Sequence, residues 1–280
     1  MAILKVDSQN RDNLRRLHTV THVLNAVLRN KYGTHVWQNG SNIKEEYGTL
    51  DVTHYKMLES LEVFDVEKSV NQIIFKGLNV IVEVKDRGIA EQEHGFILYQ
   101  GGAVPMKDLR LVSIDNLDVQ ACGGLHVDNT REIGLFKIVD VVKVQDGVLR
   151  FKYVVADFAL DFISNKQKII EKISEVFSVS EESLIASSEK FFLEWKHQKK
   201  VIDKLYDELI EMHSININNS EKDIFEINFA YDMSFMMKLA EKIVKDKFKV
   251  SCNNIIITNN MIVDKYSKII DKGKYKIYII

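Results

Sequence analysis

The stretch LRRLHTVTHVLNAVLRN (residues 14–30) has apolar residues at helical spacing and carries two histidines, His18 and His22, four residues apart. Apolar residues spaced three and four apart predict an amphipathic helix, which we expect over residues 11–30 with its end near Gly33. Residues four apart on a helix share one face, so both imidazoles can reach a single ion. The pattern indicates either a polar helix edge or half of a metal site whose other ligands lie elsewhere.

A second pair of metal-binding side chains occurs in ACGGLHV (residues 121–127), where Cys122 and His126 are again four residues apart. Gly123 and Gly124 let the backbone bend tightly enough for both side chains to face one point. Three imidazoles and a thiolate form a ligand set that suits zinc, and four protein ligands are what a purely structural zinc site has. The two pairs together predict one zinc site, formed by His18, His22, Cys122 and His126.

The composition is that of a soluble globular protein: 280 residues, 46% hydrophobic and 28% charged, with a formal net charge of −2. This balance favours no nucleic-acid partner globally, although residues 238–276 hold ten lysines against four acidic residues. That surplus is either a solvated face or a local phosphate-binding patch. The sequence contains no apolar run of about 18 residues, no signal peptide and only two cysteines, so we expect a cytoplasmic protein that does not enter a membrane.

The first half of the chain predicts mixed helices and strands that close near residue 155. We expect a helix over residues 57–75 and strands over residues 79–84 and 108–114, which are rich in β-branched residues. Asp146-Gly147 between two apolar segments is a strong signal for a β-hairpin. The predicted class of the whole chain is therefore α+β.

The second half of the chain begins with helical sequence over residues 158–177. Ser178-x-x-Glu181 is a capping box that would open a second helix, in which seven of nine residues at alternating four- and three-residue steps from 184 to 212 are apolar. This seam would pack against the preceding helix or against a second copy. Beyond it, residues 224–229, 253–258 and 274–280 predict strands and residues 232–248 predict a helix.

Five segments of the sequence closely resemble the editing domain of archaeal alanyl-tRNA synthetase, which is related to stand-alone alanyl-tRNA editing proteins and to the threonyl-tRNA synthetase editing domain. The resemblance covers about residues 5–160, and the following helical and α/β segments resemble the C-terminal domain of the same synthetase. The five segments are HTVTHVLNAVLRNKYGTHVWQNGS, LDVTHY, RGIAEQEHGFILYQGGAVP, ACGGLHV and EIGLFKI.

The resemblance implies a deacylase that removes serine or glycine from tRNA(Ala), with zinc held by the four residues named above. Thr21 matches a threonine that lines the amino-acid pocket, and Gln38 and Ser41 match polar residues that support editing. Thr21 is the candidate for contacting the serine hydroxyl, a contact whose loss would disfavour alanine. The implied domains are a zinc-dependent editing domain (residues 1–157), a helical linker or coiled coil (158–213) and a small α/β tRNA-binding domain (214–280).

The sequence departs from the family pattern at two positions, where Leu125 replaces a threonine and Thr49 replaces an arginine. It also lacks the aminoacylation domain, so this chain alone would not charge tRNA. We expect a separately encoded subunit that works with a catalytic partner subunit, or else a fragment; the start MAILKVD favours a gene product. The helical segment would allow a homodimer. The alternative function is a non-hydrolytic tRNA-binding or assembly subunit with a structural zinc.

Overall fold

The protein divides into two compact units, residues 1–172 and 173–280. Both units combine helices with sheets, so the expected α+β class is confirmed. The predicted domain limits at residues 157 and 213 stay a prediction. Among the described helices, none is long and apolar enough to cross a membrane. The computed structural model describes residues 7–100, 102, 105–227, 232–252, 254–259 and 268–279.

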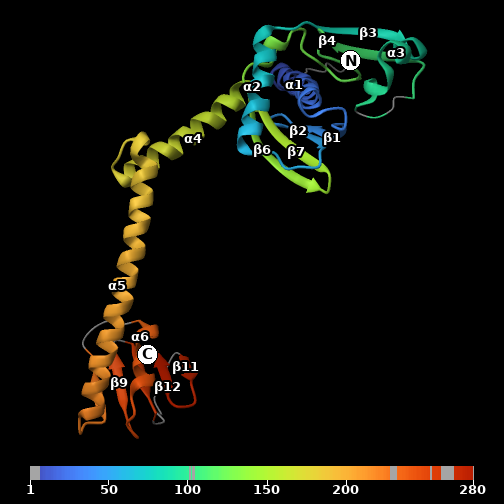
Figure 1. Ribbon diagram of the computed structural model, residues 1–280. Helices are drawn as coiled ribbons and strands as arrows, with labels where there is room; N and C mark the ends of the chain where they lie inside the picture. Colours follow the sequence, from blue (N-terminus) through green and yellow to red (C-terminus); the bar gives the residue numbers. More distant parts are fainter. Residues whose placement is uncertain are drawn as a thin grey trace, which may run out of the picture. The chain divides into compact units, whose positions relative to one another are not determined.

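Two helices and an antiparallel sheet form the body of the first unit (Figure 1). Helices α1 (Ser8–Tyr32) and α2 (Ser60–Lys76) pack on each other, α1 against strands β1, β2 and β7 and α2 against β6. The sheet order β1-β2-β7-β6 joins a hairpin from early in the chain to one more than 80 residues later. The strands are β1 (Gln38–Ile43), β2 (Gly48–Thr53), β6 (Phe136–Gln145) and β7 (Val148–Val155).

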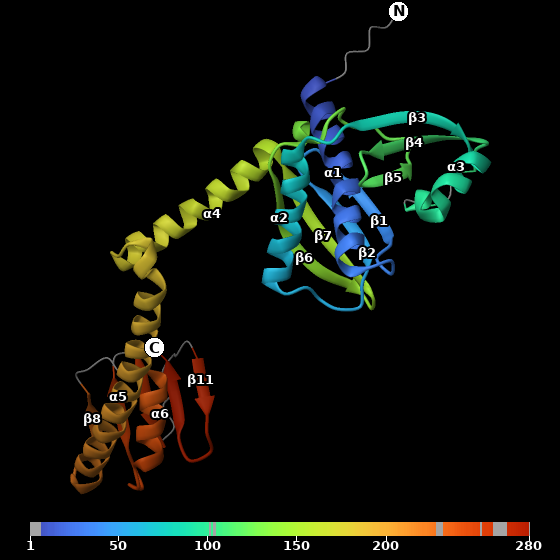
Figure 2. The ribbon, with the colours of Figure 1, turned by 45° about the horizontal axis from the view of Figure 1, so that its top comes forward.

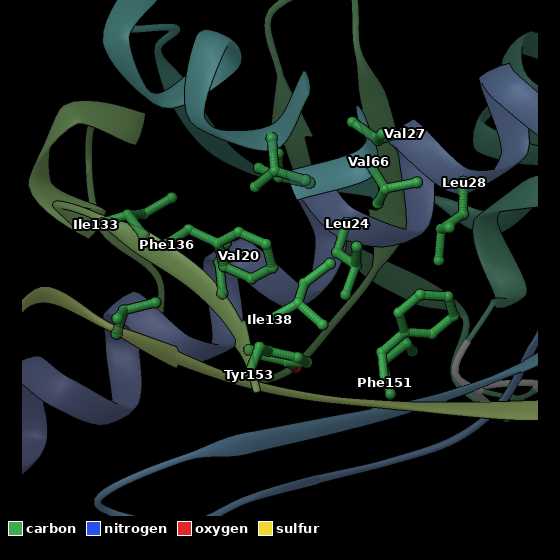
Figure 3. Packing of buried hydrophobic residues seen from close by; sticks show 14 of the residues in the cluster. Val20, Leu24, Val27, Leu28, Val66, Ile133, Phe136, Ile138, Phe151 and Tyr153 are labelled. Atoms are coloured by element: carbon green, nitrogen blue, oxygen red, sulfur yellow. The ribbon is translucent and has the colours of Figure 1, made fainter. Parts of the chain in front are cut away.

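The space between these helices and the sheet is filled by one apolar core. Figure 3 shows Val20, Leu24 and Leu28 of α1 facing Phe151 and Tyr153 of β7. The alternation of β7 explains this arrangement, because successive side chains of a strand point to opposite faces and every second one enters the core. Packing in the core therefore fixes the rotation of α1 about its own axis, which decides where the side chains on its other faces point.

A second, smaller sheet with the order β3-β4-β5 completes the first unit, together with helix α3 (Figure 2). Its central strand β4 pairs with β3 from Val80 to Asp86 and with β5 from Asp118 to Ala121. The segment after β5 carries Cys122 and His126. The remaining elements here are β3 (Val80–Asp86), α3 (Arg87–His94), a 3-10 turn (Gly95–Tyr99), β4 (Asp108–Ile114), β5 (Asp118–Ala121) and a 3-10 turn (Thr130–Ile133).

The second unit is built on the end of a long helix. Helix α5 (Leu184–Asn219) packs through its last turns with α6 (Met233–Lys242) on a five-stranded sheet of order β11-β12-β10-β9-β8. Helix α4 (Ala156–Phe177) and a 3-10 turn (Glu181–Ser183) precede α5. The strands are β8 (Ile224–Glu226), β9 (Lys249–Cys252), β10 (Ile255–Thr258), β11 (Lys268–Asp271) and β12 (Lys276–Ile279).

Two details of the predicted second half are wrong. Ser178 does not cap a helix, because its φ of 54° places it in the left-handed region after α4. Ser180 occupies the N-cap position of the following 3-10 turn, where its hydroxyl donates to the hydroxyl of Ser183. Strands β9 and β11 were not predicted, and β9 begins where the helix was expected to end. The seam of α5 is solvent-exposed over its middle in this chain, with Trp195, Ile202 and Leu205 about half exposed.

Candidate metal centre

The structure brings the four expected ligands together from two distant segments. His18 and His22 come from one face of α1, and Cys122 and His126 follow β5. Their ligand atoms lie within 4.8 Å of one another, and Cys122 Sγ is 3.4 Å from Nε2 of both His18 and His126. Tetrahedral zinc with ordinary bond lengths separates sulfur and nitrogen ligands by about 3.5 Å. The donor set and its spacing therefore fit zinc.

Gly124 gives the two segments room to meet. A Cβ atom at this position would overlap the ring of His18. Neither Gly123 nor Gly124 has a positive φ, so the bend of this loop does not depend on the left-handed conformation that favours glycine. Gly124 is needed because the imidazole of α1 lies directly against the backbone of the ligand loop.

A buried threonine fixes the ring of His126. Thr19 Oγ1 donates its hydrogen to the carbonyl of Arg15, 2.9 Å away, so it can only accept from its other neighbours. Those neighbours are the amide of Val127 at 3.1 Å and Nδ1 of His126 at 3.2 Å. His126 is therefore protonated on Nδ1, which leaves the lone pair of Nε2 for a metal. Arg15 Nε also donates to the His126 carbonyl at 2.8 Å, tying the loop to α1.

A buried carboxylate stands behind His22. Oδ2 of Asp118 is 3.5 Å from Nδ1 of His22, and both side chains are about 5% exposed. Gln120 Nε2 donates to the same carboxylate oxygen at 2.8 Å. A carboxylate beside the outer nitrogen of a ligating histidine is a frequent feature of zinc sites, where it orients the ring. Asp118, held by Gln120, therefore stands in ion-pair range of His22, whereas Thr19 is hydrogen-bonded to His126.

The pKa values of the cluster describe an imidazolium beside a thiolate, so a bound metal would displace the proton of His22. Burial opposes ionisation of Cys122, but hydrogen bonds with the three histidines outweigh it and lower the thiol pKa to about 3. Burial lowers the pKa of His22, while hydrogen bonds with Asp118 and Cys122 raise it, to about 9 overall. Burial lowers the pKa of His126 to about 4. Cys122 is thus a thiolate at neutral pH, the form that binds metals.

The three predicted catalytic residues line the same cavity as three of the ligands. This cavity of about 290 Å³ is bordered by Thr21, Gln38 and Ser41 together with His18, His22 and Cys122. Thr21 comes from the turn of α1 between the histidines, whereas Gln38 and Ser41 lie on β1 and are joined by a 3.3 Å hydrogen bond. His126, the fourth ligand, is not among the residues that border this cavity.

Thr21 can act toward a ligand only as an acceptor. Its hydroxyl donates to the carbonyl of Leu17 at 2.7 Å, and its oxygen lies 2.6 Å from the hydroxyl of Tyr153, which must then donate. Burial raises the pKa of Tyr153, so that hydroxyl keeps its proton. One lone pair of Thr21 remains for a hydroxyl donor in the cavity.

Sequence reasoning missed Thr19, Asp118 and Gln120. The signal for the last two was available, since alternation in LDVQAC places Asp118 and Gln120 on the same face of a strand and this face is buried. The two departures from the family pattern lie outside the cavity lining: Leu125 is 47% exposed, and Thr49 on β2 donates to the carbonyl of Asn42.

Comparison with known proteins relates the chain to the alanine–tRNA ligases of archaea. The family of the threonyl and alanyl tRNA synthetase second additional domain matches residues 109–152. The alanine–tRNA ligase of Methanococcus vannielii is 45% identical over 74% of this chain and 23% of its own length. Those of Methanococcus aeolicus and Methanopyrus kandleri are 38% and 41% identical, over 93% and 74% of this chain. The chain thus spans about a quarter of these relatives, and the resemblance seen in the sequence motifs is confirmed.

Proposed function

We propose that this relative of archaeal alanine–tRNA ligases is the editing and C-terminal portion of such a synthetase, and that it hydrolyses mischarged Ser-tRNA(Ala) and Gly-tRNA(Ala). One observation carries the proposal: three imidazoles and a thiolate converge beside a cavity that is lined by three of these ligands together with Thr21, Gln38 and Ser41. The relatives named above are alanine–tRNA ligases, which supports tRNA(Ala) as the partner.

The reaction is ester hydrolysis: a water oxygen adds to the carbonyl carbon, the bond to the ribose oxygen breaks, and the ribose hydroxyl takes a proton. Zinc held by His18, His22, Cys122 and His126 would supply Lewis acidity toward the carbonyl or the water. Within the chain, Gln38 Nε2 donates to Ser41 Oγ, which leaves the hydroxyl hydrogen of Ser41 to donate toward the substrate. The pair would orient the ester in the cavity.

Selection of serine follows from the hydrogen bonding of Thr21. A serine hydroxyl could donate to the remaining lone pair of Thr21 Oγ1, which is buried at 2% exposure. The methyl group of alanine offers no donor and would leave that polar atom unpaired. Sites built on such a contact reject an analogue lacking the hydroxyl far more strongly than apolar pockets do. The correct alanyl ester would thereby be spared. A glycyl ester also lacks this donor, so the Thr21 contact accounts for the choice of serine over alanine and not for the removal of glycine.

The closed ligand set favours one alternative function. Four protein side chains fill a tetrahedral shell, as in purely structural zinc sites. In that case the chain would bind tRNA or assemble with a catalytic subunit without hydrolysing the ester.

Deacylation assays with Ser-tRNA(Ala) and Ala-tRNA(Ala) distinguish the deacylase from the non-hydrolytic tRNA-binding protein. We expect the wild-type chain to release serine and to spare alanine, and His22→Ala and Cys122→Ala to lose both zinc and activity. His197→Ala is the matched control, because His197 is exposed on α5. Thr21→Val should hydrolyse Ser-tRNA(Ala) poorly while keeping its zinc. A wild-type chain that holds zinc and binds tRNA(Ala) but releases no serine would establish the alternative.

We further propose that the second unit contributes tRNA binding. Its lysine surplus is smaller than the sequence suggests, because Lys238 and Lys242 pair with Asp207 and Glu211 of α5, and Lys245 with Asp223. Lys268 on β11 and Lys272 directly after it are the better candidates for phosphate contacts, because both are exposed, whereas Lys276 of β12 pairs with Asp271. The exposed seam of α5 is the surface on which a second copy or the aminoacylation subunit would pack, which sedimentation of the purified chain at several concentrations would test.

A further inference from the structure

Strand β3 forms an open edge of the small sheet (Figure 2). In the sheet order β3-β4-β5, and among the described strands, it pairs with β4 alone, from Val80 to Asp86 and without a bulge. Three of its β-branched side chains are exposed: Ile81 by 54%, Val82 by 46% and Val84 by 71%. Soluble proteins usually protect an edge strand with a bulge, a proline, a covering segment or charges that repel a second strand. The charges of β3 are of opposite sign, Glu83 and Lys85, and can attract a second copy of the same strand.

The backbone hydrogen bonds show which side of β3 is open. The carbonyl of Asn79 accepts from the amide of Asp115, which directly follows β4, so the odd-numbered residues face β4. The amide of Val80 points the other way and donates to the carbonyl of Asp128. A bridge between Asn79 and Asn129 covers the edge at this end of the strand. Because successive strand residues alternate in direction, the backbone groups that face the open side are those of Val82, Val84 and Asp86.

The alternation and the two charges allow one register for a second copy of β3. In an antiparallel pair about a twofold axis, only residues that face the open side can exchange backbone hydrogen bonds. Placing either charged residue, Glu83 or Lys85, on the axis sets two like charges opposite each other, which is destabilising. An axis at Val82 would need the amide of Val80, which already donates to another carbonyl, and an axis at the last residue would run the strand into helix α3. Val84 is the remaining position for the axis.

We propose that two copies of this chain associate through β3, antiparallel and with Val84 on the twofold axis, so that the small sheet continues into that of the second copy. In this register Glu83 of each copy lies directly opposite Lys85 of the other, on both sides of the axis. Within one chain Lys85 Nζ already lies 3.4 Å from Glu83 and 2.7 Å from Glu93, so the pairing joins these charges into one network. The exposed side chains of Val84 meet each other and are removed from water, which favours association.

Cysteine cross-linking tests the register directly. Directly paired residues of antiparallel strands have Cα atoms about 4.5–5.5 Å apart, a separation that a disulfide can span. Under mild oxidation we expect Val84→Cys to form a disulfide-linked dimer, because this residue faces itself across the axis. Glu83→Cys and Lys85→Cys should each remain unlinked alone and should cross-link when the two variants are mixed. Val82→Cys is the matched control, because this exposed residue would lie opposite Asp86, and the wild-type chain controls for its two native cysteines.

Sedimentation measures the strength of the association. A single strand edge buries less area than the roughly 1,600 Å² of an ordinary interface, so concentrations up to about 100 μM are needed. Glu83→Lys sets a lysine opposite Lys85 of the second copy and should weaken dimerisation about tenfold, and Lys85→Glu should do the same with two carboxylates. The double variant Glu83→Lys/Lys85→Glu restores opposite charges and should regain the wild-type dissociation constant. Circular dichroism checks that each variant is folded.

Cross-linking of Val84→Cys but not of Val82→Cys, together with recovery of dimerisation in the double variant, would establish the β3 interface. Equal cross-linking at both positions would show association without a register and would overturn the proposal, as would an unlinked Val84→Cys. Leu205→Lys, which places a charge on the half-exposed seam of α5, separates the two candidate surfaces. Dimers that are lost in Leu205→Lys and unchanged in Glu83→Lys would assign self-association to α5 and reject β3. None of these measurements depends on the deacylase activity.

Discussion

The buried hydroxyls of α1 offer a paired test of how the metal centre is organised. Thr19 and Thr21 lie two residues apart, are both buried, and both donate to the carbonyl four residues earlier. Only Thr19 touches a predicted ligand, through Nδ1 of His126. Thr21 instead meets the hydroxyl of Tyr153. Valine in place of either threonine keeps the shape of the side chain and removes the hydroxyl. The two variants therefore differ mainly in which neighbouring group loses its hydrogen bond.

The expected magnitudes differ between zinc affinity and stability. In Thr19→Val the amide of Val127 loses a buried acceptor, which costs about 1–3 kcal/mol in the free energy of unfolding. Thr21→Val leaves the buried hydroxyl of Tyr153 without its hydrogen-bond acceptor, which lowers the free energy of unfolding by a similar amount. Zinc affinity should separate the two variants. Loss of the group that fixes the His126 tautomer should weaken zinc binding about 10- to 100-fold, whereas Thr21→Val should leave it within about threefold.

Competition with a chromophoric chelator at fixed pH measures the zinc affinity, and urea unfolding of the metal-free chains measures stability. The comparison controls for general loosening of α1, because both variants carry the same chemical change on the same helix. Equal zinc affinities for the two variants would refute the tautomer argument. A stability loss in Thr19→Val without any loss of zinc affinity would show that Nδ1 of His126 needs no fixed acceptor.

Three further predictions follow from neighbouring contacts. Asp118→Asn removes the charge behind His22 and should weaken zinc binding about tenfold in the chelator assay; a variant with wild-type affinity would exclude Asp118 as a support for the ring. Gly124→Ala places a methyl group on the ring of His18, so isothermal titration should detect at least tenfold weaker zinc binding, and unaltered binding would mean that the loop can move away. Lys268→Ala on exposed β11 should reduce the slope of log K against log salt for tRNA binding by about 0.9, and an identical slope would remove this strand from the tRNA surface.

Local patterns in the sequence were sufficient for much of the fold. The hairpin turn at Asp146-Gly147 and strand β4 were predicted at their observed positions, because turn chemistry and periodicity act over a few neighbours. The capping box at Ser178 failed because two serines two residues apart both precede acidic residues. Only the backbone conformation distinguishes them: Ser178 ends α4 in the left-handed region, whereas Ser180 is extended.

The short strands of the second unit could not be predicted in the same way. Strands β9 and β11 have four residues each, and β11 is largely exposed. A four-residue strand carries too little alternation to stand out, and its existence depends on the partners that pair with it. β11 pairs with β12, and β9 with β10 and β8, so these strands are determined by tertiary contacts rather than by their own composition.

In the candidate site, residue type alone predicted the ligands, whereas the residues that support them could be found only from the folded structure. The four ligand types could be predicted because few other residues bind zinc, and the chain has only two cysteines. Their supporting residues could not, because threonine and glutamine have many ordinary uses. Thr19 on α1 and Gln120 on β5 gain their meaning only when the loop after β5 lies against α1.

The hydrogen bonds around the metal centre have a consequence for its energetics. The ligand loop is fastened to α1 by protein contacts alone: Arg15 Nε to the His126 carbonyl, and the Val127 amide to Thr19. Most of the conformational entropy of the loop is therefore already lost when the apolar core folds, before any metal binds. Metal binding is then not needed for the first unit to fold. Small zinc domains differ, because they are unfolded without their ion. The metal-free chain should accordingly keep its cooperative unfolding transition, and a metal-free chain without native circular dichroism would contradict this reasoning.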